Sequence, residues 1–175
     1  MKRFAVVLAC LALPLVVGVP AAAAQPTCGV VWGSLLKSAA DLVPSPVTGV
    51  RLGRHACFDR MVIDLGANPA PGYFVQYTDG VHTPGEGRLI PMAGGATLTI
   101  TALAPSYDDN GVSTVPWRWG THIAQPQFRT FRDVVFAGSF EGETTFGLGV
   151  RARLPFRVLQ LENPSRLVID VAHRW

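Results

Sequence analysis

The sequence predicts an all-β protein, an antiparallel β-sandwich of about 8–10 short strands with little helix. Three observations support this expectation. Apolar and polar residues alternate with a period of two in short runs, as they do in strands with one buried face. Glycine and proline, 18 and 14 residues of the chain, separate these runs at close intervals. No stretch shows the longer period that an amphipathic helix requires.

The amino-terminal residues have the features of a secretory signal peptide. Lys2 and Arg3 precede an apolar run over Phe4–Val19, and an alanine-rich cleavage site closes the segment. The run is shorter than a usual bilayer span and Pro14 interrupts it, so a retained membrane anchor is the weaker interpretation. We therefore expect residues 1–24 to be removed, which leaves a secreted or envelope protein without a stable membrane span.

The length of the chain predicts one domain after the signal peptide, and its charge indicates which partners to exclude. The remaining chain suits a single core, and we divide it into an amino-terminal segment over residues 25–46 and a β-sandwich over residues 47–175. Loss of the two charges of Lys2 and Arg3 lowers the formal net charge from +3 to +1. A positive field this weak argues against a nucleic-acid partner.

Two cysteines remain in the predicted mature chain, Cys28 and Cys57. In an oxidising exterior this number predicts one disulfide, which ties the amino-terminal segment to the strand that begins near Phe58. Such a bridge stabilises the fold by roughly 3 kcal/mol. The alternative, a metal site, lacks soft ligands at suitable spacing. The histidines are scattered, at His55, His82, His122 and His173.

The first part of the chain after the signal peptide contains strand-like runs separated by turns. For Gly29–Ala40 two interpretations stay open, a short strand through Trp32 with or without a helical turn after it. Strands are predicted at Val47–Gly53, Arg60–Leu65, Tyr73–Thr78, Leu89–Met92, Ala96–Ala102 and Gly120–Ala124. We place Leu89–Met92 at a sheet edge because Pro91 cannot donate a hydrogen bond to a neighbouring strand.

The last third, Arg129–Val171, shows the clearest alternation, and we predict a meander of four strands there. Gly142 supplies the positive φ that the first hairpin needs. Pro164 marks the turn between the last two strands, because its φ is fixed and it has no N–H.

One hexamer occurs twice in similar form. Arg60–Leu65 and Arg166–Val171 both read as arginine, three apolar residues, aspartate and an aliphatic residue. Either this is coincidence between two core strands, or two related sheets each carry such a strand. In both cases the Arg and Asp share a face of the strand and can pair with neighbouring strands.

The longest stretch without a pattern is Ala104–Arg118, and loops of this length are often functional. Trp117 and Trp119 lie two residues apart and can form an aromatic platform for sugar rings. The alternative is a core or edge role for at least one of them, because aromatic side chains carry a large apolar area.

Arginines are the candidates for binding an anionic ligand. Arg151 and Arg153 are expected to share one face of a strand. The full set of candidates is Arg129, Arg132, Arg151, Arg153 and Arg157. Guanidinium groups match carboxylates such as those of peptide stems or acidic wall glycans. The more ordinary alternative is a solvated face paired with Glu141, Glu143 or Asp133.

Catalytic motifs are weak or missing in the sequence. Glu141 and Glu143 form a possible carboxylate pair for glycoside hydrolysis, but at a hairpin tip both are expected to be exposed and ionised. There is no G-x-S-x-G motif, phosphate loop or dinucleotide fingerprint. We therefore expect no enzymatic activity, no cofactor and no metal.

Short motifs follow one another in order from the middle of the chain to its end. They are His55-x-Cys57-Phe-Asp-Arg60 followed by Val62-Ile-Asp, then Arg129–Asp133, Phe140–Gly149, Arg153–Arg157 and Arg166–Asp170. Together they resemble the actinobacterial secreted AMIN-like domain proteins, over Val47–Trp175. The resemblance implies a β-sandwich distantly similar to the AMIN domain, which targets cell-wall amidases and secretion pores to peptidoglycan.

What the resemblance implies for function is a non-catalytic module that binds peptidoglycan or an associated glycan of the cell envelope. We expect no attached amidase or pore domain, and in this the chain would depart from AMIN proteins. Two alternatives stay open. One is a module that docks an envelope protein through a strand edge or the loop at 104–118, and the other is a small cell-wall hydrolase that uses Glu141 or Glu143.

Overall fold

The structure is a computed structural model that describes residues 28–40, 45–66 and 69–175. Over these ranges the chain forms twelve strands and no helix, which confirms the predicted all-β class. Accordingly, none of the described residues belongs to a helix long and apolar enough to cross a membrane. The predicted signal peptide lies outside the described residues.

The strands are β1 (Lys37–Ala39), β2 (Val47–Arg54), β3 (Phe58–Leu65), β4 (Tyr73–Thr78), β5 (Val81–His82), β6 (Leu89–Ile90), β7 (Ala96–Ala102), β8 (Thr121–Ala124), β9 (Phe131–Phe140), β10 (Glu143–Val150), β11 (Phe156–Leu161) and β12 (Arg166–Ala172). Their number exceeds the predicted one because β1 and β5 are too short for alternation to reveal them.

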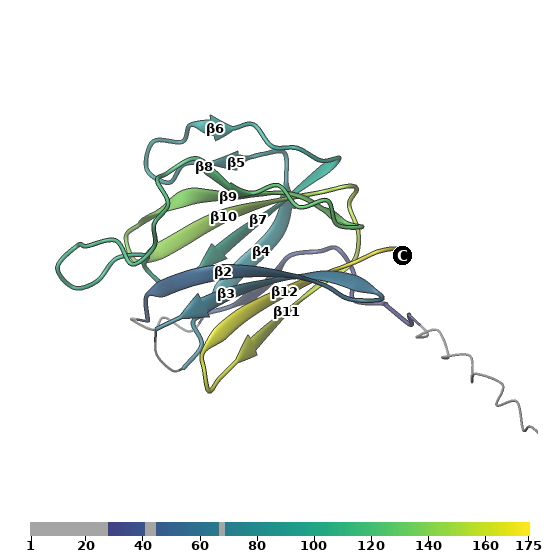
Figure 1. Cartoon of the computed structure of the whole chain (residues 1–175), viewed down its shortest axis with the longest axis horizontal. Coiled ribbons are helices and arrows are strands. Elements are labelled where there is room, and N and C mark those ends of the chain that lie inside the picture. Colours follow the sequence, from purple (N-terminus) through teal and green to yellow (C-terminus); the bar gives the residue numbers. More distant parts are fainter. Residues whose placement is uncertain (1–27, 41–44, 67–68) are drawn as a thin grey trace, which may run out of the picture.

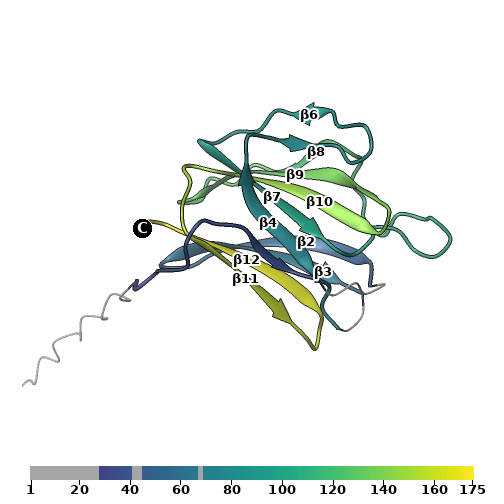
Figure 2. The same ribbon diagram turned by 180° about the vertical axis from the view of Figure 1, so that it is seen from behind.

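Ten strands form two antiparallel sheets that pack face to face (Figures 1 and 2). The six-stranded sheet has the order β1-β4-β7-β10-β9-β8, and the four-stranded sheet has the order β11-β12-β3-β2. The core between them includes Leu98, Ile100, Phe146 and Leu148 from the first sheet and Met61, Ile63, Leu167 and Ile169 from the second, all 0% exposed. The predicted sandwich is thus confirmed.

Strand β3 shows how the alternation divides the four-stranded sheet into an inner and an outer face. Met61, Ile63 and Leu65 are buried in the core, whereas Arg60 and Asp64 are partly exposed on the opposite side. Successive side chains of a strand point to opposite faces. The outer face of this sheet therefore carries charged residues, which matter for the sites described below.

Strands β5 and β6 pair as a small hairpin on the outer face of the six-stranded sheet (Figure 1). A second apolar cluster joins this hairpin to β9, made of Val81, Ile90, Val135 and Ala137. Glycines on β10 permit the close approach of the segment that follows β6. A Cβ at Gly147 would lie 2.5 Å from Sδ of Met92, and one at Gly149 would lie 2.1 Å from the carbonyl oxygen of Ala93. The hairpin therefore depends on two positions without side chains.

The last third does not form the predicted four-strand meander. Strands β9 and β10 pair in the six-stranded sheet, and β11 and β12 pair in the four-stranded sheet. Between them, residues 151–155 cross from one layer to the other. The two turns were predicted correctly: Gly142 has a φ of 82°, and Pro164 lies in the turn between β11 and β12.

The repeated hexamers lie next to each other in one sheet, so the interpretation as two related sheets is wrong. Strands β3 and β12 pair antiparallel, with Arg60 opposite Asp170 and Arg166 opposite Asp64. Antiparallel pairing of two segments with the same order of charges brings opposite charges together at both ends. The repeat thus gives complementary charges across the centre of the four-stranded sheet.

Several contacts attach the amino-terminal arm, residues 28–40, to the sandwich. Its first residue forms the predicted Cys28–Cys57 disulfide, with a Cα–Cα distance of 5.4 Å. The carbonyl oxygen of Gly33 accepts a hydrogen bond from the N–H of Phe156 at 2.9 Å. Strand β1 then pairs with the edge strand β4. Residues 28–33 form no strand, so the predicted short strand through Trp32 is wrong. A bend at residues 34–35 and strand β1 take the place of the optional helical turn.

A buried carboxylate joins the two layers. Asp59 of β3 is 0% exposed, and its Oδ2 accepts hydrogen bonds from the N–H groups of Thr130 at 2.6 Å and Phe131 at 3.2 Å. Its Oδ1 lies 3.1 Å from Nε2 of His173, which is 6% exposed. One side chain thereby fixes the start of β9 and the residue after β12.

Candidate functional site

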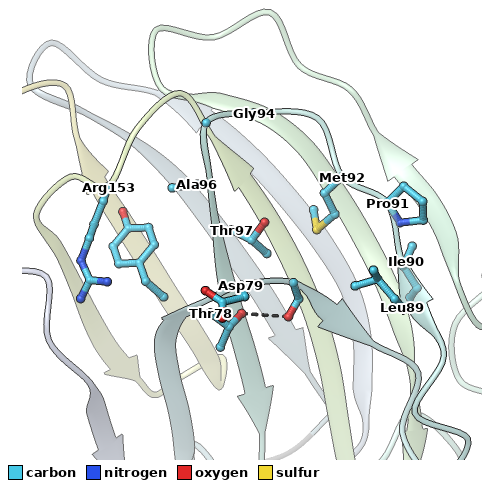
Figure 3. A pocket seen from close by; sticks show the side chains of 13 residues that line it. Thr78, Asp79, Leu89, Ile90, Pro91, Met92, Gly94, Ala96, Thr97 and Arg153 are labelled. Atoms are coloured by element: carbon cyan, nitrogen blue, oxygen red, sulfur yellow. Dashed lines mark hydrogen bonds between the residues drawn. The ribbon is translucent and has the colours of Figure 1, made fainter.

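A groove of about 510 Å³ lies on the six-stranded sheet. It lies between the outer face of β4 and β7 and the β5–β6 hairpin (Figure 3). Figure 3 shows Arg153 at one end, Leu89 and Met92 at the other, and Thr97 between them. The groove therefore combines a cation, a hydroxyl and an apolar wall.

The floor of the groove is polar because threonines occupy the outward positions of β7 and the last position of β4. Thr78 lies opposite Thr97, and its Oγ1 donates to the carbonyl oxygen of Gly80 at 2.9 Å. The same hydroxyl lies 2.6 Å from Oγ1 of Thr99. Hydroxyl groups that both donate and accept suit sugar hydroxyls and amides.

Arg153 is held at the end of the groove from several sides. Its Nη2 donates to the carbonyl oxygen of Ser34 at 3.1 Å, and its guanidinium carbon lies 5.0 Å from the ring centroid of Tyr77. Its own carbonyl oxygen accepts a hydrogen bond from Nε1 of Trp175 at 3.2 Å. An arginine positioned in this way, and still exposed, can receive a carboxylate without first losing much side-chain entropy.

Tyr77, whose ring packs against the Arg153 guanidinium, is itself held by hydrogen bonds. Its hydroxyl donates to the carbonyl oxygen of Leu154 at 2.9 Å and accepts from the N–H of the same residue at 3.0 Å. Burial raises the pKa of Tyr77 above its ordinary value of 10.0. The neutral phenol therefore fixes the segment that carries the arginine.

The two tryptophans of the sequence prediction line a second, smaller hollow of about 280 Å³, beside the 104–118 loop. Trp117 packs on Phe136 and Phe146 with ring centroids 5.8 and 6.4 Å apart, so one of the pair does have a core role. Trp119 is 42% exposed and lies against Gly138, where a Cβ would be 2.7 Å from its ring. Only Trp119 offers much of its ring to solvent.

The five arginines predicted as candidates for an anionic ligand are distributed over different parts of the molecule. Arg151 and Arg153 lie in the crossing segment and not on a strand, so their predicted common strand face is wrong. Pairing of β10 with β7 ends at Val150, where the chain leaves the six-stranded sheet. Arg151 donates to the carbonyl oxygen of His173. Alternation alone did not reveal where the strand would leave its sheet.

Two other members of the predicted set lie before and in β9. Arg132 donates from Nη1 to the carbonyl oxygens of Phe128 at 2.5 Å and Phe131 at 2.8 Å, so its charge caps the local backbone. Arg129 is exposed. Neither lines the groove on the six-stranded sheet.

Arg157 lies on the outer face of the four-stranded sheet. Its Nε donates to Oδ2 of Asp170 at 2.8 Å, and its guanidinium carbon lies 4.2 Å from the ring centroid of Trp32. Arg60 binds the same carboxylate from the other side, at 2.6 and 2.9 Å. This hydrogen bonding raises the pKa of Arg60 above its ordinary value. The repeated hexamer was the sequence signal for the Arg60–Asp170 pair.

The acidic and histidine candidates do not assemble into a further site. Glu141 and Glu143 are both exposed at the tip of the β9–β10 hairpin. Nδ1 of His122 lies 2.9 Å from Oδ1 of buried Asp133, whose Oδ2 accepts from the N–H of Ala93 at 3.0 Å. Within the described part of the chain, no group of three or more His, Cys, Asp or Glu side chains is arranged to hold a metal ion.

Comparison with known proteins identifies a family. No curated protein and no solved structure matches the chain. The family model described as the AMIN-like domain matches residues 45–173, which include the groove, Arg157 and every strand of the two sheets except β1. The match spans most of the sequence and agrees with the resemblance of its motifs. The chain belongs to the AMIN-like domain family.

Proposed function

We propose that this AMIN-like domain is an extracytoplasmic, non-catalytic module that binds peptidoglycan through the groove on the six-stranded sheet. The family points to a module associated with peptidoglycan in the cell envelope. The Cys28–Cys57 disulfide is of the kind that persists in an oxidising compartment, which supports a location outside the cytoplasm.

The observation that carries the proposal is Arg153 at the end of an open, hydroxyl-lined groove. Peptidoglycan presents sugar hydroxyls, N-acetyl amides and the carboxylates of its peptide stems. The threonine hydroxyls of β4 and β7 match the first two groups, and the guanidinium matches the third. Leu89, which is 57% exposed, gives the opposite wall an apolar surface for the methyl groups of N-acetyl substituents.

Co-sedimentation with purified insoluble peptidoglycan tests this function. Wild type is expected to sediment at low and moderate salt, and Arg153→Gln is expected to bind about tenfold more weakly, since a charge-assisted contact is lost. Arg129→Gln is the matched control, because it removes an equal charge from an exposed site outside the groove. Thr97→Val removes only a hydroxyl from the floor and is expected to weaken binding less.

Two results would contradict the proposal. One is failure of the wild type to sediment at any salt concentration tested. The other is an equal loss of binding in Arg129→Gln and Arg153→Gln, which would indicate a general effect of charge. A muropeptide-release assay on the same samples is expected to show no products, and release that depends on Glu141 or Glu143 would identify a hydrolase.

A further inference from the structure

We infer that the outer face of the four-stranded sheet carries a second binding site, for the carboxylate of an acidic polysaccharide. The site consists of Arg60, Arg157 and Asp170 with the rings of Trp32 and Phe58, and we call it the arginine–tryptophan site. It lies on the opposite layer from the groove, and it does not depend on the peptidoglycan proposal.

Strand register brings three charged residues of this site into one row. Asp170 of β12 lies opposite Arg60 of β3 on one side and opposite Arg157 of β11 on the other. Residues directly opposite each other share a face of the sheet. The two guanidinium groups therefore converge on one carboxylate, with Nε–Oδ distances of 2.6 and 2.8 Å.

The charges in this row do not balance. Asp170 is 0% exposed, and its single negative charge is shared between two guanidinium groups whose side chains are 26% and 35% exposed. One positive charge is left on the surface. Arg60 uses Nε and Nη2 for the carboxylate, whereas Arg157 uses only Nε. The remaining Nη donors suit a second carboxylate, which would also relieve the repulsion between the two cations.

Aromatic rings hold the Arg157 guanidinium in place. The guanidinium carbon of Arg157 lies 4.2 Å from the centroid of Trp32 and 5.3 Å from that of Phe58, and the two rings meet edge to face at 5.6 Å. The Cys28–Cys57 disulfide fixes the arm that carries Trp32. The cation is thus oriented before any ligand arrives, which lowers the entropic cost of binding.

The surroundings favour a sugar acid over a small free anion. The next row of the sheet carries Val62, Val168 and Leu159 on the same outer face, beside the arginine row. Val62 and Leu159 are partly exposed, and Trp32 is partly exposed as well. Apolar and aromatic atoms next to forked donors match a pyranose ring that bears a carboxylate, since its C–H faces are apolar and its acid group is planar.

The same face offers a matched control. Arg51 donates from Nε and Nη2 to the two oxygens of Asp64, at 2.7 and 2.6 Å. That pair is balanced, one charge against one, and the Arg51 side chain is 61% exposed. Removing this guanidinium changes the net charge of the face as much as removing that of Arg157, but it leaves the arginine–tryptophan site intact.

Polygalacturonate is the probe, with its methyl ester as the uncharged form of the same polymer and dextran sulfate as a different polyanion. Binding to the disulfide-bonded protein is measured by calorimetry at low and moderate salt. We expect wild type to bind polygalacturonate, Arg157→Gln to bind it at least tenfold more weakly, and Arg51→Gln to stay within twofold of wild type.

A third variant separates binding from folding, because Arg157→Gln leaves Asp170 with one cation fewer. Arg157→Lys keeps the charge next to Asp170 but loses the planar group that stacks on Trp32 and donates twice. It is expected to melt close to wild type and to bind about fivefold more weakly. Sedimentation with peptidoglycan is expected to be unchanged in all variants of Arg157.

Three outcomes would overturn the inference. Equal binding of polygalacturonate and its methyl ester would show that no carboxylate is recognised. Binding of dextran sulfate as tight as that of polygalacturonate would show a response to charge alone. A loss in Arg51→Gln equal to that in Arg157→Gln would show that the whole face, and not this site, holds the polymer.

Discussion

Replacing Asp59 by alanine is expected to destabilise the fold by about 3–5 kcal/mol, because the carboxylate is the buried link between the layers. The change removes acceptors at 2.6 and 3.2 Å from the N–H groups of Thr130 and Phe131, both of which are 0% exposed. Each buried donor left without a partner costs about 1–3 kcal/mol. His173, at 3.1 Å, also loses its partner.

Urea unfolding of the oxidised protein, followed by tryptophan fluorescence, measures this cost as a change in the free energy of unfolding. Asp59→Asn keeps one acceptor oxygen and is expected to lose about half as much. Asp64→Ala is the control on the same strand, because its partner Arg51 is 61% exposed and such surface pairs contribute about 1 kcal/mol or less. Equal losses in the alanine variants of Asp59 and Asp64 would refute the interpretation of a buried link.

Three further predictions concern the same fold. Replacing both cysteines by serine is expected to lower the free energy of unfolding by roughly 3 kcal/mol, measured by urea unfolding. The same change is expected to alter the fluorescence emission of Trp32. Gly149→Ala would place a Cβ 2.1 Å from a backbone oxygen, so a loss of about 1–3 kcal/mol is expected, whereas Gly29→Ala, with nothing within 4 Å, should change stability little. Burial raises the pKa of Tyr77 above 10.0, so its contribution to stability is full below that pH and falls as the pH rises through the higher value of the folded state. Unfolding measured between pH 8 and about 12 should show this decline in wild type and a weaker one in Tyr77→Phe.

Alternation in the sequence predicted many of the strands. The predicted ranges Tyr73–Thr78 and Ala96–Ala102 coincide with β4 and β7. In both, β-branched and aromatic residues dominate and inward positions alternate regularly. In these two strands the alternation in the sequence agrees with the burial in the structure, and for this reason they could be predicted from a single sequence.

Strand partners were harder to predict than strands. The alternation of apolar and polar residues predicts which residues share a face of a strand. It does not predict which strand lies beside which. The four runs of the last third therefore suggested a meander, although residues 151–155 cross between layers. The similarity of the hexamers at 60–65 and 166–171 is visible in the sequence, but their pairing with each other follows only from the sheet order.

The candidate site shows the same limit. Arg153 was predicted as a ligand-binding residue and does line the groove, but it lies in the crossing segment. The threonine floor and the β5–β6 wall were not predicted, because neither has a composition that differs from that of ordinary strands and turns. Arg157 was predicted only as one of five candidate arginines, whereas the partners that hold it, Trp32 and Asp170, come from the arm and from β12.

The crossing segment between β10 and β11 has a length that is more tightly constrained than its amino-acid composition. Phe156 is 0% exposed in the core and its neighbour Arg157 points outward, so removing one residue from the connection would slip β11 and exchange these two orientations. A phenylalanine would then be solvated while a cation entered the apolar interior. Deletions here should therefore be far more harmful than substitutions, even at exposed positions.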